Sequence, residues 1–134
     1  MNPERVDEIV AAAILARESA YAPYSRFLVG AAILSSSGKI YSGCNVENIS
    51  YSLTICAERN ALSSAVADRE RDFTYLAIVA DTKEPISPCG ACRQVMAEFG
   101  NFPVLSLNLA NRRFESTVEE LLPRAKTGIL DHTS

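Results

Sequence analysis

Three cysteines carry the strongest chemical signal in this 134-residue chain. Cys89 and Cys92 form a Cys-x-x-Cys pair, a spacing that lets both thiolates bind one zinc ion, and Cys56 can supply a third soft ligand from another segment. Structural zinc sites usually close with four protein ligands, whereas catalytic sites keep one position for water. The cysteines therefore predict a catalytic Zn2+ site with one ion per chain.

Cys44, the remaining cysteine, leaves two interpretations open. It lies a dozen positions before Cys56 and could complete a four-cysteine structural site. The alternative is a buried, inert thiol, which is the commoner fate of a free cysteine. We favour the second interpretation.

Glu58 is the candidate proton carrier. It lies two positions after Cys56, and side chains two apart on a regular helix point to different sides, so the pair converges only if a helix begins here. Its carboxylate would then take a proton from the metal-bound water and deliver it onward. The alternative is an ordinary helix N-terminal carboxylate stabilised by the helix dipole.

The charge of the proposed centre needs compensation, because three thiolates and one zinc ion leave a net negative charge. Arg59 can donate hydrogen bonds to the thiolates, and two helix N-termini aimed at the metal add partial positive charge. Gln94 is expected to hold Arg59 in place. The alternative for Arg59 is a surface salt bridge.

Composition excludes several other functions. The net charge of -3 and a pI near 5.2 provide no basic field for long nucleic acid. The only histidine is His132 in the tail, which disfavours a cysteine–histidine nucleophile, and the six glycines are too scattered for a phosphate loop. No stretch approaches about 20 apolar residues, so we expect no membrane partner.

Residues 9–16 form the longest apolar run near the N-terminus, and they follow acidic rather than basic residues, unlike a secretory signal. We therefore expect a cytoplasmic protein. In that reducing compartment the four cysteines are better interpreted as thiols than as disulfides.

The apolar periodicity defines the elements that must position these residues. It predicts helices over 3–19, 56–66, 91–99 and 117–122, and strands over 27–34, 39–44, 75–80, 104–109 and 113–116. This order predicts an α/β fold with three layers, in which helices cover both faces of a central mixed five-stranded sheet. We expect one domain over 1–134, with a mobile tail at 127–134.

The two cysteine segments and four further motifs resemble the zinc-dependent cytidine deaminase family, in its compact three-cysteine, homotetrameric form. The resemblance covers nearly the whole chain. It is carried by the segments 22–27, 29–32, 43–48, 56–59, 88–94 and 119–123. It implies the cytidine deaminase-like fold and a place in pyrimidine salvage.

The resemblance implies hydrolytic deamination of cytidine and deoxycytidine, by zinc-bound hydroxide with Glu58 as the proton shuttle. It also assigns substrate contacts. Asn45 and Glu47 match residues that bind the ribose hydroxyl, Phe27 matches a ring packed against the base, and Ala57 matches a backbone contact to the base edge. In an extended chain Asn45 and Glu47 face the same way, and Val46 is expected to point into the core.

Two positions concern neighbouring subunits of the implied homotetramer. Tyr51 matches a residue brought across a subunit boundary, so the active sites would be shared. Lys126 stands where the family usually has a phenylalanine that approaches the base from another subunit. This departure leaves base stacking and substrate preference open.

Three alternatives remain. Blasticidin S deaminases share the zinc motifs, but Asn45 and Glu47 favour a nucleoside. A non-catalytic zinc-stabilised module would keep the cysteines and have no use for Glu58. A deaminase of polynucleotides is disfavoured by the acidic charge balance.

Overall fold

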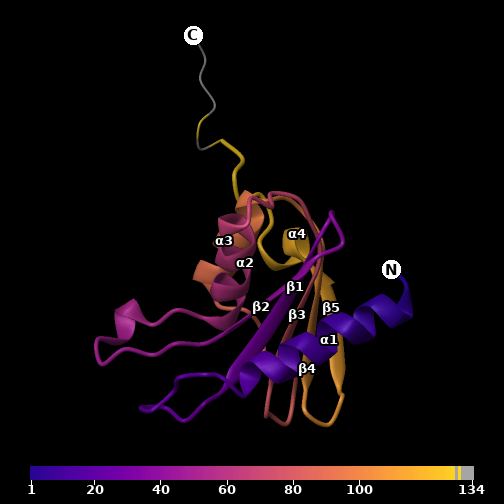
Figure 1. Cartoon of the computed structure of the whole chain (residues 1–134). Coiled ribbons are helices and arrows are strands. Elements are labelled where there is room, and N and C mark those ends of the chain that lie inside the picture. The colour runs from indigo at the N-terminus through magenta and orange to yellow at the C-terminus, as the bar shows by residue number, and fades with distance from the viewer. Residues whose placement is uncertain (129, 131–134) are drawn as a thin grey trace.

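The computed structural model describes residues 1–128 and 130. Within these residues five strands form one sheet, which four α-helices and a short 3-10 helix accompany (Figure 1). The helices are α1 (Pro3–Arg17), α2 (Ala57–Ala67), α3 (Gly90–Glu98) and α4 (Val118–Leu121), and the 3-10 helix is η1 (Tyr51–Leu53). The strands are β1 (Val29–Ser35), β2 (Ile40–Cys44), β3 (Phe73–Ala80), β4 (Pro103–Asn108) and β5 (Arg113–Thr117).

The sheet has the order β2-β1-β3-β4-β5 and is mixed. Strands β3 and β4 pair in parallel, while every other neighbouring pair is antiparallel. A parallel pair requires a crossover connection, which α3 provides between β3 and β4. β1 is buried at every position and β3 at all but Thr74, as expected for central strands that are covered on both faces.

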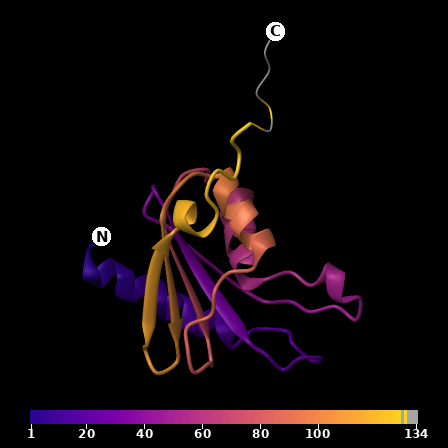
Figure 2. The same cartoon turned by 180° about the vertical axis from the view of Figure 1, so that it is seen from behind.

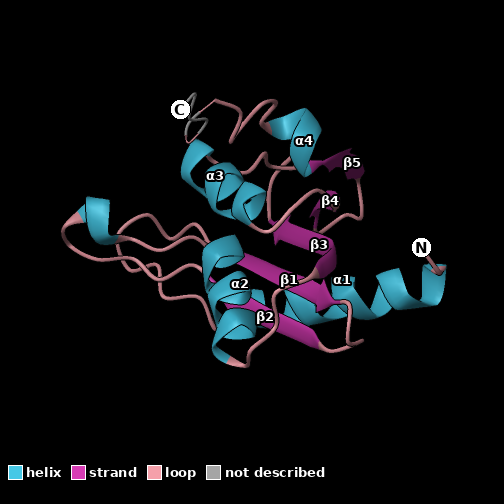
Figure 3. Cartoon of the chain, turned by 90° about the horizontal axis from the view of Figure 1, so that it is seen from above, coloured by secondary structure: helices cyan, strands magenta, loops and turns pink. Residues whose placement is uncertain are grey.

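Helix α1 covers one face of the sheet (Figure 3). Its residues Ile9, Val10 and Ala13 are buried in a cluster with apolar side chains of β1, β3 and β4. The backbone of α1 lies very close to β1, because a Cβ atom added at Gly30 would stand 2.0 Å from the Ala13 carbonyl oxygen. Glycine is therefore required at position 30.

Helices α2 and α3 cover the opposite face, with α4 beside α3 (Figure 2). Leu62 of α2 and Met96 of α3 are buried in the second apolar cluster, which forms the larger core. A Cβ atom at Gly43 would lie 2.4 Å from the Ala61 backbone nitrogen, so α2 packs directly on β2. This contact sets the short distance between α2 and the sheet.

Residues 45–55, which we call the arm, project from the body of the molecule (Figure 3). The arm is anchored at its base, where Val46 and Ile55 exchange two backbone hydrogen bonds of 2.9 Å and Val46 forms a bridge with Tyr21. The arm exposes five large apolar side chains, with exposed fractions from 42% to 81%. They are Val46, Ile49, Tyr51, Leu53 and Ile55.

The structure confirms the predicted three-layer α/β/α arrangement and the five-stranded mixed sheet. Helix η1 was not predicted, because three residues are too few to show a helical period. The expectation that Val46 points into the core is wrong, since Val46 is 42% exposed. Asn45 and Glu47 lie on the buried side instead, where their side chains accept hydrogen bonds from the backbone N–H groups of Val29 and Tyr24.

None of the helices within residues 1–128 is both long and apolar enough to cross a membrane. The predicted tail at 127–134 falls mostly outside the described residues, as does His132.

Candidate metal centre and active site

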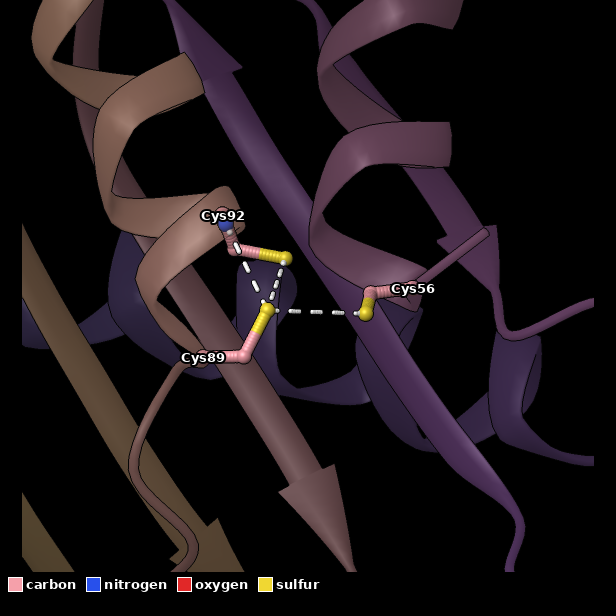
Figure 4. A group of neighbouring side chains, drawn as sticks. All are labelled: Cys56, Cys89 and Cys92. Atoms are coloured by element: carbon pink, nitrogen blue, oxygen red, sulfur yellow. Dashed lines mark hydrogen bonds between the residues drawn. The ribbon is translucent and has the colours of Figure 1, made fainter. Parts of the chain in front are cut away.

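The sulfur atoms of Cys56, Cys89 and Cys92 lie close together and face one another (Figure 4). The Sγ atoms of Cys56 and Cys89 are 3.8 Å apart, those of Cys89 and Cys92 are 3.4 Å apart, and all three lie within 4.8 Å of one another. Zinc–sulfur bonds of about 2.3 Å in a tetrahedron place the sulfurs about 3.8 Å apart. The three side chains, called the cysteine trio below, thus fit a zinc ion and leave a fourth position open.

The trio forms because two helices begin at the same place. Cys56 is the N-cap of α2 and Cys89 is the N-cap of α3, while Cys92 lies in the first turn of α3. The Cys89 sulfur accepts a hydrogen bond of 3.4 Å from the Cys92 backbone N–H, as an N-cap side chain does. Both helix dipoles therefore present their positive ends to the sulfurs.

The pKa values of Cys56 and Cys92 are shifted in opposite directions. Hydrogen bonds from the Cys92 thiol, and then from Arg59 and Cys89, lower the pKa of Cys56 to about 5. Its hydrogen bond to Cys56, together with burial, raises the pKa of Cys92. A second negative charge beside the first is costly, and a divalent cation removes that cost. The electrostatics of the trio therefore favour a bound metal ion.

Arg59 partly offsets the negative charge of the trio. Its Nη2 atom donates hydrogen bonds of 3.4 Å to the Cys56 sulfur and to the Thr54 carbonyl oxygen, and the Cys56 contact raises the pKa of Arg59 further. Its Nε atom is buried and, among the described residues, has no partner. Gln94 is exposed and does not bond Arg59 within the described chain, so the role predicted for Gln94 stays a prediction.

Glu58 lies beside the trio in the first turn of α2. Because α2 begins at Ala57, the condition set by the spacing of Cys56 and Glu58 is met. Glu58 is only 5% exposed. Burial raises the pKa of Glu58, and the nearby Cys56 charge adds to this. Glu58 is thus a buried carboxyl group beside the candidate metal site.

Cys44 does not join the trio. Among the described residues, Cys56, Cys89 and Cys92 are the only group of three or more histidine, cysteine, aspartate or glutamate side chains close enough to share a metal ion. Cys44 is half-buried at the end of β2. The structure therefore does not support the four-cysteine alternative.

Asn45 and Glu47 are both buried at the base of the arm. The Asn45 side chain accepts a hydrogen bond of 2.9 Å from the Val29 N–H and donates one of 2.7 Å to the Phe27 carbonyl oxygen. The Glu47 carboxylate accepts hydrogen bonds from the N–H groups of Tyr24 and Ser25, at 3.0 and 3.1 Å, and from the Ser25 hydroxyl. The two side chains thus fix residues 24–29.

Sequence reasoning missed the role of Ser25, although this residue lies inside one of the recognised motifs. Its hydroxyl is the first cause of a lowered pKa at Glu47, whose two backbone hydrogen bonds act in the same direction. Glu47 therefore stays ionised and oriented. A serine in a turn is common, so its type gave no signal of this partner.

The other predicted contacts occupy different environments. Phe27 is 41% exposed, so its ring is free to meet a ligand, whereas Ala57 is fully buried at the start of α2. Tyr51 is 64% exposed near the tip of the arm, where its ring meets Tyr24 edge-on at 5.8 Å. Lys126 pairs with Glu98 at 3.7 Å on the surface beside α3.

Comparison with known proteins adds independent information. The family model of the cytidine and deoxycytidylate deaminase zinc-binding region matches residues 3–106. A cytidine deaminase of Sporosarcina psychrophila is 56% identical over 122 residues, which make up 90% of either chain. One from Halalkalibacterium halodurans is 54% identical over 121 residues, covering 89% of this chain and 92% of that relative.

The fold agrees as well. The crystal structure of cytidine deaminase from Burkholderia pseudomallei matches this chain with a TM-score of 0.85 at 47% identity. The match covers 92% of this chain and 98% of that one.

The ligand set predicts the metal content of variants. We expect purified protein to carry one zinc per chain, Cys92→Ala to lose most of it, and Cys44→Ser to keep it, because Cys92 belongs to the trio and Cys44 does not. Elemental analysis with protein quantification measures this. A Cys44→Ser protein without zinc, or a Cys92→Ala protein with full zinc, would contradict the assignment.

Proposed function

The chain belongs to the cytidine and deoxycytidylate deaminase family, and we propose that it hydrolyses cytidine and deoxycytidine to uridine and deoxyuridine, with release of ammonia. It is a zinc-dependent hydrolase of this family. The single observation that carries the proposal is the cysteine trio at two helix N-termini, with the buried Glu58 beside it. The relatives with 54–56% identity bear the name cytidine deaminase.

Bound zinc supplies a Lewis acid that lowers the pKa of a coordinated water to about 7. We assign the proton transfers to Glu58. Its carboxylate takes one proton as the water oxygen bonds to the amine-bearing ring carbon and delivers it to the ring nitrogen. It then takes the second proton of the same oxygen and delivers it to the leaving amine, which departs as ammonia. Burial of Glu58 keeps bulk water from competing for these protons.

Asn45 and Glu47 are proposed to bind the ribose. An ionised carboxylate offers about four acceptor sites, and Glu47 uses three of them on Tyr24 and Ser25. The Asn45 amide donates one of its two N–H groups to the Phe27 carbonyl oxygen. An acceptor site on Glu47 and an N–H donor on Asn45 therefore remain, which suits a hydroxyl group that both donates and accepts.

The base would meet apolar and backbone groups. The exposed ring of Phe27 is available for stacking, and the backbone of Ala57, next to the ligand Cys56, is available to the base edge. Asn45 holds Phe27 through its carbonyl oxygen. Recognition of the ribose and of the base is thereby linked through one side chain.

We further propose that the protein is a homotetramer with shared active sites. Exposed apolar patches on a single chain mark interaction surfaces, and the arm concentrates five large apolar side chains there. Tyr51 lies on the arm, so a neighbouring subunit could receive its ring. This packing would bury the apolar surface of the arm.

The cellular setting is also a proposal. All four cysteines are free, and a three-thiolate site is best preserved in a reducing compartment such as the cytoplasm. Conversion of a cytosine nucleoside to a uracil nucleoside is a pyrimidine salvage reaction. We place the enzyme in that process.

Replacing Glu58 tests the proton transfers. We expect Glu58→Gln to lower kcat for cytidine by about 10²- to 10⁴-fold, because general acid–base catalysis contributes about this much. Zinc content should remain that of the wild type, since Glu58 is not part of the trio. Glu4→Gln, which changes a first-turn glutamate of α1, serves as the matched control. A near-normal rate in Glu58→Gln would refute the assignment.

A substrate panel tests the ribose contacts. We expect Glu47→Gln to raise KM for cytidine by about tenfold or more, because a hydrogen bond to a charged group contributes about 1.5–3 kcal/mol. Any turnover of free cytosine should be unchanged, since cytosine has no ribose. Steady-state kinetics with cytidine, deoxycytidine, cytosine and blasticidin S make the comparison.

The same panel separates the alternatives. Turnover of blasticidin S without nucleosides would place the chain with the blasticidin deaminases, and no turnover of any compound would favour the inert zinc module. An unchanged KM for cytidine in Glu47→Gln would remove Glu47 from the ribose site.

Light scattering tests the assembly. We expect a mass about four times the 14.5 kDa of one chain, and smaller species for the double substitution Ile49→Ser with Leu53→Ser, which removes apolar surface from the arm. Leu15→Ser, which changes an exposed leucine of α1, is the control. A monomeric wild-type protein, or a tetramer unaffected by the double substitution, would contradict this proposal.

A further inference from the structure

We propose that Arg93 is a positioning residue that holds residues 85–88, called here the ligand loop, so that Cys89 presents its sulfur to the metal. The inference rests on the zinc site of the proposed function and deepens it. Arg93 lies near the start of α3, immediately after Cys92. It acts through Cys89 and not on a reacting atom.

The guanidinium group of Arg93 bonds three acceptors at once. Its Nε atom donates to the Pro88 carbonyl oxygen at 2.8 Å, and Nη2 donates to the Ser87 hydroxyl at 2.5 Å. Its Nη1 atom donates to the Leu121 carbonyl oxygen at 2.8 Å. A planar guanidinium offers five N–H donors in a fixed fork, which a lysine ammonium cannot reproduce.

The ligand loop has few other attachments. Among the hydrogen bonds of the described residues, those of Ser87 and Pro88 come only from Arg93, and Pro85 and Ile86 have none. Ile86 packs against the larger core, and Pro88 is buried. The loop nevertheless borders a hollow of about 300 Å³ that Phe114 and Leu121 also line, so packing supports it on one side only.

Cys89 is the member of the trio that most needs such support. Cys92 is fully buried within α3, and Cys56 receives a hydrogen bond from Arg59. Cys89 is exposed and directly follows Pro88, whose carbonyl oxygen Arg93 fixes. The Cys92 N–H also bonds the Cys89 sulfur, but the backbone of Cys89 enters α3 directly from the ligand loop, so the position of this sulfur depends on the loop.

The third contact extends the same restraint to α4. Leu121 is the last residue of α4, and carbonyl groups at a helix end lack partners within the helix. By donating to this carbonyl, Arg93 connects the end of α4 to the ligand loop. The end of α4 is thus linked by a side-chain hydrogen bond to the helix that carries Cys92.

Zinc affinity tests the proposal without any nucleoside. We expect Arg93→Ala to weaken zinc binding by about 10- to 100-fold, the usual effect of losing a group that supports a metal ligand, and Arg93→Lys to fall between it and the wild type. Competition with a chromogenic zinc chelator measures this on the full-length protein. Arg71→Ala is the matched control, because Arg71 also donates to two backbone carbonyl oxygens but lies far along the chain from the trio.

A spectroscopic readout separates positioning from general stability. We expect the sulfur-to-metal absorption of the cobalt(II)-loaded protein to change in Arg93→Ala and to remain unchanged in Arg71→Ala. Wild-type zinc affinity and an unchanged spectrum in Arg93→Ala would overturn the proposal, as would an equal loss of affinity in Arg71→Ala. If Arg93→Ala does not fold, wild-type affinity in Arg93→Lys would overturn it, and reduced affinity would support it. Loss of deamination alone leaves these readouts unaffected, so a failed proposed function would be recognised separately.

Discussion

The central constraint on this fold is that Cys56 and Cys89 bring their sulfurs close enough to bind one ion. Helices α2 and α3 begin at these two residues and therefore lie side by side. The sheet supplies the platform, since α2 packs directly on β2 at Gly43. Both helix dipoles and Arg59 then balance part of the thiolate charge. The start of α2 at Ala57 also places Glu58 in the first turn of the helix, beside the trio.

Much of this could be predicted from the sequence because the relevant signals are local. Cys89 and Cys92 have the spacing of a zinc pair, and apolar periodicity located the helices that begin at the ligands. The direction of Val46 could not be predicted, because alternation along a strand says which residues share a side and not which side is buried. Asn45 and Glu47 are on the buried side because they accept hydrogen bonds from backbone N–H groups there, such as that of Val29.

The contacts of Arg93 and Ser25 illustrate a second limit. Arg93 bonds Leu121, 28 positions away, and Ser25 bonds Glu47, 22 positions away. Neither pairing has a local sequence signature, because each depends on the fold to bring the partners together. The three cysteines that fit a metal ion were therefore evident from their type and spacing, whereas the residues that hold the neighbouring segments in place required the structure.

The most direct test of the central claim is X-ray absorption spectroscopy of the zinc-loaded protein. A trio with an open fourth position predicts three sulfur neighbours at about 2.3 Å and one lighter ligand at about 2.0 Å. Four sulfur neighbours would mean that Cys44 closes the site, and would contradict a catalytic zinc centre built from Cys56, Cys89 and Cys92.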